Sequence, residues 1–190
     1  MALILASASP QRKTLLQEIG VSFQAIPSSI DENACDEENP GKRAEILALL
    51  KARDVHASHK NDWVLGCDTL VEAHDGSILE KPVDANDAKR MIALQSGKIS
   101  HVHSALALIS PDGSEHVGLS TSHVRFATLD SKTIDEWTEK GLWKDRSGAF
   151  QIDGPGQLLI EHLEGDWTGV VGLPVFLFGQ LCTKAGLAIT

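Results

Sequence analysis

The residues whose types could carry out chemistry are carboxylates and cations spread along the chain. Asp68 stands within the apolar run 64–71, where a buried carboxylate is costly unless it is paired or binds a metal. Two carboxylates and three cations make up the set: Asp68, Glu32, Arg12, Lys51 and Lys81. Carboxylates can hold a divalent metal and cations can hold phosphate oxygens, so this set predicts phosphoryl chemistry.

Each of the other candidate segments also has a plainer interpretation. Ser9-Pro10-Gln11-Arg12 has the residues of a helix N-terminus that binds an anion, and an ordinary cap beside a surface arginine fits equally well. The glycine-rich stretch 147–156, which contains Gln151, suits a loop that wraps a ligand, or a simple connector. Lys81 closes a predicted hairpin, where a surface lysine is also common. His101 and His103 share one strand face, which favours a partly exposed strand over a metal site.

Helices and strands alternate along the chain, and some adjacent strands are joined by tight turns. This order predicts an α/β fold with a mixed sheet. The expected helices are Pro10–Ile19, 39–59, Ala85–Gln95, Ser131–Lys140 and Leu173–Ala185. The expected strands are Leu3–Ala6, Val21–Ile26, Trp63–Ala73, Ile78–Pro82, Ser100–Ile109, Glu115–Phe126 and Gln157–Leu163. Lys51 is the one charged member of an otherwise apolar helix face.

Composition excludes several classes of protein. The chain has 190 residues, with 17 Lys and Arg against 26 Asp and Glu, which gives a formal charge of −9. A charge of this sign argues against broad nucleic-acid binding. No apolar run is long enough for a membrane span, and the first residues lack the pattern of a secretory signal. The three cysteines form no C-x-x-C pair and suit free thiols, so we expect a cytoplasmic protein.

Seven spaced segments together resemble the Maf family of nucleoside triphosphate pyrophosphatases. They are 5–12 with Leu15-Leu16, Asp31-Glu32, Lys51-Ala52, Gly66-Cys67-Asp68-Thr69, Glu80-Lys81-Pro82 with Leu94 and Ser96-Gly97, 147–152, and 170–174. The resemblance implies one domain over 1–190, with a Maf/inosine-triphosphatase-like mixed twisted sheet in two lobes around a cleft. It also implies cleavage of a nucleoside triphosphate to the monophosphate and pyrophosphate.

The same resemblance implies roles for individual residues. Asp68 matches the family's proton acceptor and would share a Mg²⁺ or Mn²⁺ ion with Glu32. The cations Arg12, Lys51 and Lys81 would hold the triphosphate, with Ser9 binding another phosphate oxygen. We expect a homodimer.

The resemblance extends to the substrate. Thr69 and Gln151 match the branch that acts on dTTP and UTP, and an amide can read a pyrimidine carbonyl and ring N–H. The family usually has two arginines after the Ser-Pro, whereas here Gln11 precedes Arg12, which points to looser selectivity. The alternatives are a broad or 7-methyl-GTP-type house-cleaning pyrophosphatase, and a septation regulator that acts by binding.

Overall fold

The fold is built on one mixed sheet of seven strands. The computed structural model describes residues 1–189. The strands are β1 (Leu3–Leu5), β2 (Gln24–Ala25), β3 (Trp63–Glu72), β4 (Ile78–Leu79), β5 (Ile99–Ile109), β6 (Glu115–Phe126) and β7 (Ile160–Glu164). Their order is β2-β1-β3-β5-β6-β7, with β4 paired to β3. β1 is parallel to β2 and β3, and the pairs from β3 to β7 are antiparallel. The predicted mixed α/β fold is therefore confirmed.

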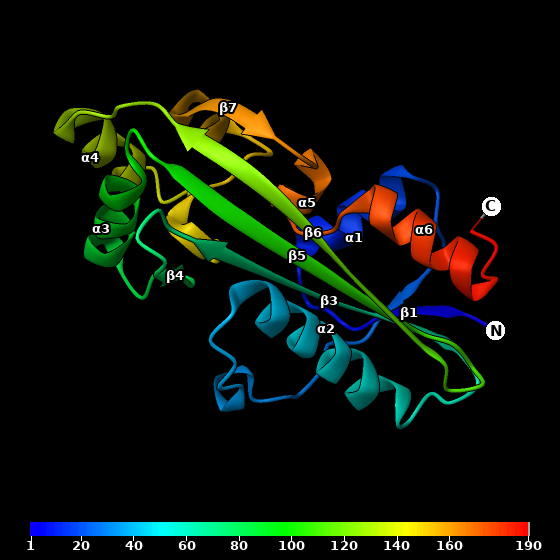
Figure 1. The fold of residues 1–190 in the computed structure, drawn as a ribbon. Helices are drawn as coiled ribbons and strands as arrows, with labels where there is room; N and C mark the ends of the chain where they lie inside the picture. Colours follow the sequence, from blue (N-terminus) through cyan, green and yellow to red (C-terminus); the bar gives the residue numbers. More distant parts are fainter. Residues whose placement is uncertain (190) are drawn as a thin grey trace.

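Within residues 1–189, six α-helices and three 3₁₀ turns surround this sheet. The helices are α1 (Pro10–Glu18), α2 (Pro40–His56), α3 (Ala85–Gln95), α4 (Ser131–Glu139), α5 (Trp167–Val171) and α6 (Val175–Ala185). The 3₁₀ turns are η1 (Glu32–Ala34), η2 (Ser147–Ala149) and η3 (Pro155–Leu159). In Figure 1 the long strands β5 and β6 connect one group of elements, α1, α2 and α6, to a second group, α3, α4 and β7.

Opposite faces of β3 bury different helices. Its even-numbered residues, such as Val64, share an apolar cluster with the alanines of α2. Its odd-numbered residues, such as Leu65, pack with Leu15 and Leu16 of α1 and with Phe178 of α6. Because successive strand residues point to opposite faces, neighbours on β3 belong to different environments. This separation decides which side chains can meet at the site.

Short polar residues begin α1, α2 and α3, as the sequence predicts. The Ser9 hydroxyl accepts from the Arg12 backbone N–H, and Asn39 and Asp84 cap α2 and α3 in the same way. Each occupies the N-cap, where a side-chain oxygen satisfies a backbone N–H that has no partner inside the helix. Pro10 and Pro40 follow two of these caps at the first helical position.

Four elements differ most from the prediction. The strand expected over Ile78–Pro82 pairs only at Ile78–Leu79. The strand expected over Val21–Ile26 pairs only at Gln24–Ala25, because β1 offers just three residues for pairing. The strand expected from Gln157 begins at Ile160, since the segment after Pro155 first forms η3. The helix α5, capped by Asp166, forms between the expected strand that ends at Leu163 and the expected helix from Leu173, where no element is expected.

Of the residues described, no helix combines the length and the apolar character that crossing a membrane requires.

Candidate active site

Asp68 is a nearly buried carboxylate with one bound and one free oxygen. Asp68 lies in the middle of β3 and is 3% exposed. Oδ1 accepts from Lys51 Nζ at 2.6 Å, while Oδ2 is buried without a hydrogen-bond partner among the described residues. Burial raises the pKa of this carboxyl above its ordinary value, against the opposing effect of the Lys51 ammonium. A buried acceptor left open in this way is a place where a ligand or proton can bind.

Lys51 reaches Asp68 because α2 lies unusually close to β3. A Cβ placed on Gly66 would stand 2.0 Å from the carbonyl oxygen of Ala48, so the close approach requires glycine at that position. Lys51, one turn further along α2, is 7% exposed on the face that packs against the sheet. The predicted anomaly of a charge on an apolar helix face is thus explained by its ion pair with Asp68.

Glu32 completes a row of three charges that runs from the interior to solvent. Its Oε1 lies 3.0 Å from Lys51 Nζ, and its side chain is 54% exposed. Glu32 opens the turn η1, which Asp31 caps by accepting from the Asn33 N–H at 3.0 Å. The lysine therefore stands between a buried and an exposed carboxylate, 2.6 Å and 3.0 Å away.

The two carboxylates fit the ligand chemistry of a hard divalent cation. Mg²⁺ and Mn²⁺ prefer oxygen ligands, and protein sites often supply only one or two carboxylates with substrate phosphates and water making up the remainder. Asp68 Oδ2 has no hydrogen-bond partner among the described residues, and the Glu32 side chain is half exposed. The residues present therefore suit the metal that the resemblance implies.

Arg12 lies on the other face of β3, in a closed network. Its Nε donates to the Gly172 carbonyl at 2.9 Å, and Nη1 donates to Ser7 Oγ at 3.1 Å and to the Cys67 carbonyl at 3.0 Å. Nη2 donates to Thr69 Oγ1 at 3.2 Å. The guanidinium thus joins the segment after β1, the middle of β3 and the end of α5.

Thr69 belongs to the same network rather than to the Asp68 cluster. Its hydroxyl lies 3.0 Å from Ser104 Oγ, which in turn donates to the Gly169 carbonyl at 2.5 Å. Asp68 and Thr69 are adjacent in sequence, yet strand alternation sends their side chains to opposite sides of the sheet. Sequence reasoning gave no role to Ser7 or Ser104. Both are buried serines, Ser104 within β5 and Ser7 just after β1, and burial of a polar side chain among apolar residues is the same signal that singled out Asp68.

Ser9 and Gln11 are linked at the start of α1. The Ser9 hydroxyl donates to Gln11 Oε1 at 2.9 Å and is placed 3.5 Å from the Arg12 backbone nitrogen. Gln11 stands where the resemblance leads us to expect an arginine, and its side-chain carbonyl accepts from the capping serine. The cap predicted for this segment is confirmed, and both side chains are partly exposed.

Lys81 and Gln151 are positioned by the second group of elements. Leu79 pairs with Val71 antiparallel, so the chain through Lys81 runs back along β3 toward the middle of that strand. Lys81 is exposed and has no ion-pair partner within residues 1–189. Gln151 follows η2, which packs on β3 and β4, and its side-chain amide lies against Gly154. The structure records no contact between either side chain and Asp68.

Cys67 is a packing residue. Its side chain is fully buried in the cluster with α1 and α6. Burial raises the pKa of the Cys67 thiol to about 11, which keeps it protonated and poorly nucleophilic at neutral pH.

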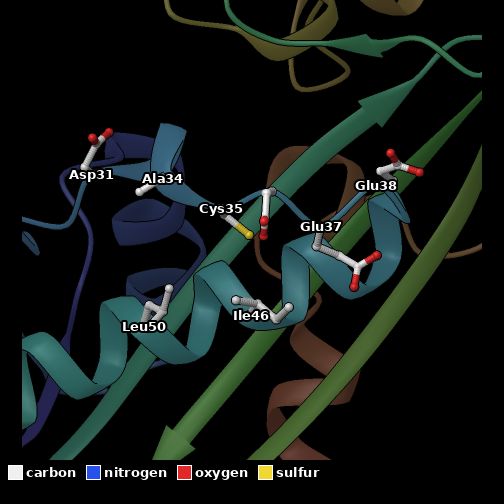
Figure 2. Close-up of a pocket in the computed structure, with 8 residues that line it drawn as sticks. Asp31, Ala34, Cys35, Glu37, Glu38, Ile46 and Leu50 are labelled. Atoms are coloured by element: carbon white, nitrogen blue, oxygen red, sulfur yellow. The ribbon is translucent and has the colours of Figure 1, made fainter.

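A cavity of about 540 Å³ opens near the Asp68, Lys51 and Glu32 charges, between η1 and the outer face of α2. Figure 2 shows Ile46 and Leu50 of α2 on one side and the acidic segment after Asp31 on the other. Its lining residues are Asp31, Ala34, Cys35, Asp36, Glu37, Glu38, Ile46 and Leu50. Four of these are acidic and none is basic, so the cavity itself repels a polyphosphate.

Comparisons with known proteins agree with the motifs and the fold. A family model described as Maf-like protein matches residues 2–185. A dTTP/UTP pyrophosphatase of Methylobacillus flagellatus is 41% identical over 194 residues, 97% of this chain and 93% of the relative. One of Symbiobacterium thermophilum is 38% identical over 187 residues, 98% of this chain and 95% of the relative. A solved HAM1 protein from Coxiella burnetii has the same fold, with a TM-score of 0.56 at 15% identity over 99% of this chain and 100% of that chain.

Proposed function

This chain belongs to the Maf family, and from that premise we propose that it hydrolyses dTTP and UTP to the nucleoside monophosphate and pyrophosphate. Relatives at 41% and 38% identity that carry the name dTTP/UTP pyrophosphatase support the substrate. The observation that carries the chemistry is the buried Asp68, paired to Lys51 through Oδ1 and open at Oδ2.

In the proposed reaction Asp68 takes a proton from the attacking water. The water oxygen bonds to the α-phosphorus, the bond from that phosphorus to the bridging oxygen breaks, and pyrophosphate leaves with the electron pair. Burial raises the pKa of the Asp68 carboxyl, which makes it a better proton acceptor than an exposed aspartate. Lys51 holds the carboxylate in place at 2.6 Å, so its orientation is fixed before the substrate arrives.

We assign the cations different tasks according to their surroundings. Lys51 lies between two carboxylates and stabilises negative charge at the reacting centre. Lys81 is exposed and unpaired among the described residues, so it is available for the triphosphate. Arg12 is bound to three other segments and acts on the site by positioning them, with one Nη2 N–H left for a phosphate oxygen. Ser9 at the N-cap of α1 supplies a further polar contact.

A Mg²⁺ or Mn²⁺ ion held by Glu32 and Asp68 would offset the charge of the phosphates when it is bound. We also propose that Gln151 reads the pyrimidine edge and that Thr69 and Gln11 shape the site indirectly, through Arg12 and Ser9. These proposed roles come from the family resemblance, and the residues concerned lie on several different elements of the fold.

The deciding experiment is a panel of canonical and modified nucleoside triphosphates, assayed with Mg²⁺ or Mn²⁺ by direct detection of pyrophosphate. We expect dTTP and UTP to be turned over fastest. Equal turnover of purine and pyrimidine nucleotides would instead support a broad house-cleaning enzyme, and release of inorganic phosphate alone would refute the pyrophosphatase reaction.

We further propose that the chain works as one domain over 1–190, in the cytoplasm and as a homodimer. The absence of disulfides among the described cysteines, Cys35, Cys67 and Cys182, is consistent with a reducing compartment. Light scattering after size-exclusion chromatography measures the oligomeric state, and a monomer at micromolar concentration would contradict the dimer.

A further inference from the structure

A second group of charged and metal-ligating side chains lies further along β3, apart from the Asp68 cluster. Glu72 is four residues beyond Asp68 on the same face, about 13 Å along an extended strand. It pairs in register with His101 of β5, and His103 lies two residues further on that same face. Sequence reasoning favoured a partly exposed strand for the two histidines, because the cross-strand acid is not visible from their spacing.

The three side chains converge on one point. Glu72 Oε2 lies 2.9 Å from His103 Nε2 and 3.7 Å from His101 Nδ1. One ligand atom from each of the three residues lies within 4.8 Å of the others. A tetrahedral ion bound at 2.0–2.1 Å needs ligand atoms about 3.3 Å apart. The distances from Glu72 Oε2 to His103 Nε2 and to His101 Nδ1, 2.9 Å and 3.7 Å, lie on either side of this value. Small side-chain rotations would therefore complete the geometry without moving the strands.

The chemistry of the group suits a borderline-soft cation. The 2.9 Å contact requires a proton on His103 Nε2, because a carboxylate only accepts; a metal ion would replace that proton. The other nitrogen of the ring, Nδ1, lies 3.2 Å from Thr121 Oγ1, a partner that fixes the ring orientation. The His103 side chain is 12% exposed and that of His101 46%, so the group is supported from inside and open to solvent.

We propose that Glu72, His101 and His103 form a zinc site with an open coordination position, separate from the catalytic carboxylates. Two histidines and one glutamate are a ligand set that zinc uses, whereas the paired carboxylates at Asp68 suit Mg²⁺ or Mn²⁺. His123 of β6 pairs with His101 in register, and their ring centroids are 4.8 Å apart, so a third imidazole stands beside the group. A bound ion would join β3 to β5 next to the hairpin that carries Lys81.

Zinc titration of the full-length protein by isothermal calorimetry tests this site. We expect one Zn²⁺ per chain and a rise in Tm on binding. The double variant His101→Gln/His103→Gln should weaken binding by at least about tenfold and lose the rise in Tm. Glu72→Gln, which keeps both imidazoles and the shape of the side chain, provides a second variant if the double variant folds poorly.

Two matched variants separate this site from other zinc binding. His162→Gln removes an exposed histidine on β7 and should bind zinc as the wild type does. Asp68→Asn should also keep the zinc site, because Asp68 belongs to the other cluster. Equal affinity in the wild type and the double variant, or loss of binding in Asp68→Asn but not in Glu72→Gln, would overturn the proposal.

Discussion

The two faces of β3 around residues 68 and 69 use polar groups in opposite ways. On one face Asp68, Lys51 and Glu32 form a row of charges with a free buried oxygen at Asp68. On the other, the Arg12 guanidinium binds four acceptors from three segments, and the Thr69 hydroxyl has a partner in Ser104. Both faces carry motif residues of the family.

From this difference we infer which face reacts and which face supports it. A buried polar group that lacks a partner costs free energy unless a ligand or proton supplies one, whereas a satisfied network mainly rigidifies the fold. We therefore expect the Asp68 face to react, and the Arg12 face to hold the Cys67 backbone and the loop after β1 in register beside it. Substitutions on the two faces should consequently separate activity from stability.

The largest effect is expected for Asp68→Asn. The amide keeps the shape of the side chain but cannot accept the proton from water, so pyrophosphate release should fall on the order of 10²–10⁴-fold. The change is measured as kcat by pyrophosphate detection on the preferred substrate. Thermal unfolding monitors the fold in parallel.

The exposed Asp36 provides the matched control for that substitution. Asp36→Asn removes the same charge from the acidic segment next to Glu32 without touching Lys51, and should keep nearly full activity. Comparable losses in both variants would mean that overall charge, rather than the buried carboxylate, controls the rate.

Arg12→Ala tests the supporting face. Removing the guanidinium leaves buried acceptors unpaired, including the carbonyls of Cys67 and Gly172, so the free energy of unfolding should fall by about 2–4 kcal/mol. Urea unfolding measures the loss, and Arg125→Ala, at an exposed position on β6, should change stability little. If Arg12→Ala stays as stable as the wild type while KM rises more than tenfold, the arginine acts mainly as a phosphate ligand.

Sequence reasoning located the reactive face more completely than the supporting one. Asp68 and Lys51 both break an apolar pattern, and their pairing explains both anomalies. Strand alternation also separates Asp68 from Thr69, but which helix covers each face depends on the crossover connections, which periodicity does not encode. The network of Arg12 with Gly172 joins residues 160 positions apart, a contact that no local pattern specifies.

Because local patterns do not specify contacts between distant segments, some observed elements differ from the predicted ones. Short pieces such as β2 and α5 are set by what lies beside them rather than by their own periodicity. Long strands and capped helices were predicted nearly to the residue, as β3 and α3 show.

Lys81→Ala should have a smaller effect, confined to substrate binding. The side chain is exposed and has no partner in the described chain, so stability should not change, while KM for the triphosphate should rise about tenfold through loss of one charge-assisted contact. Steady-state kinetics measure this, and Lys60→Ala, another exposed lysine, is the control. A large loss of kcat at unchanged KM would place Lys81 in the reacting centre beside Lys51.

The smallest effect is a difference in how stability depends on pH. Burial raises the pKa of Asp68 above 3.8 in the folded protein, so between that value and the folded pKa the folded state binds more protons than the unfolded chain. The stability that Asp68 contributes therefore falls as pH rises through this window, and wild type should lose stability relative to Asp68→Asn over it.

For Asp112 the dependence of stability on pH has the opposite sign, because the Ser110 hydroxyl that donates to it lowers the pKa of Asp112 to about 2. Wild type should consequently gain stability relative to Asp112→Asn as pH rises from about 2 through 3.8. Urea unfolding across this range measures how the stability difference between wild type and each variant changes with pH. If this difference changes with the same sign for Asp68→Asn and Asp112→Asn, Asp68 is stabilised as a carboxylate and has no raised affinity for the proton it must accept.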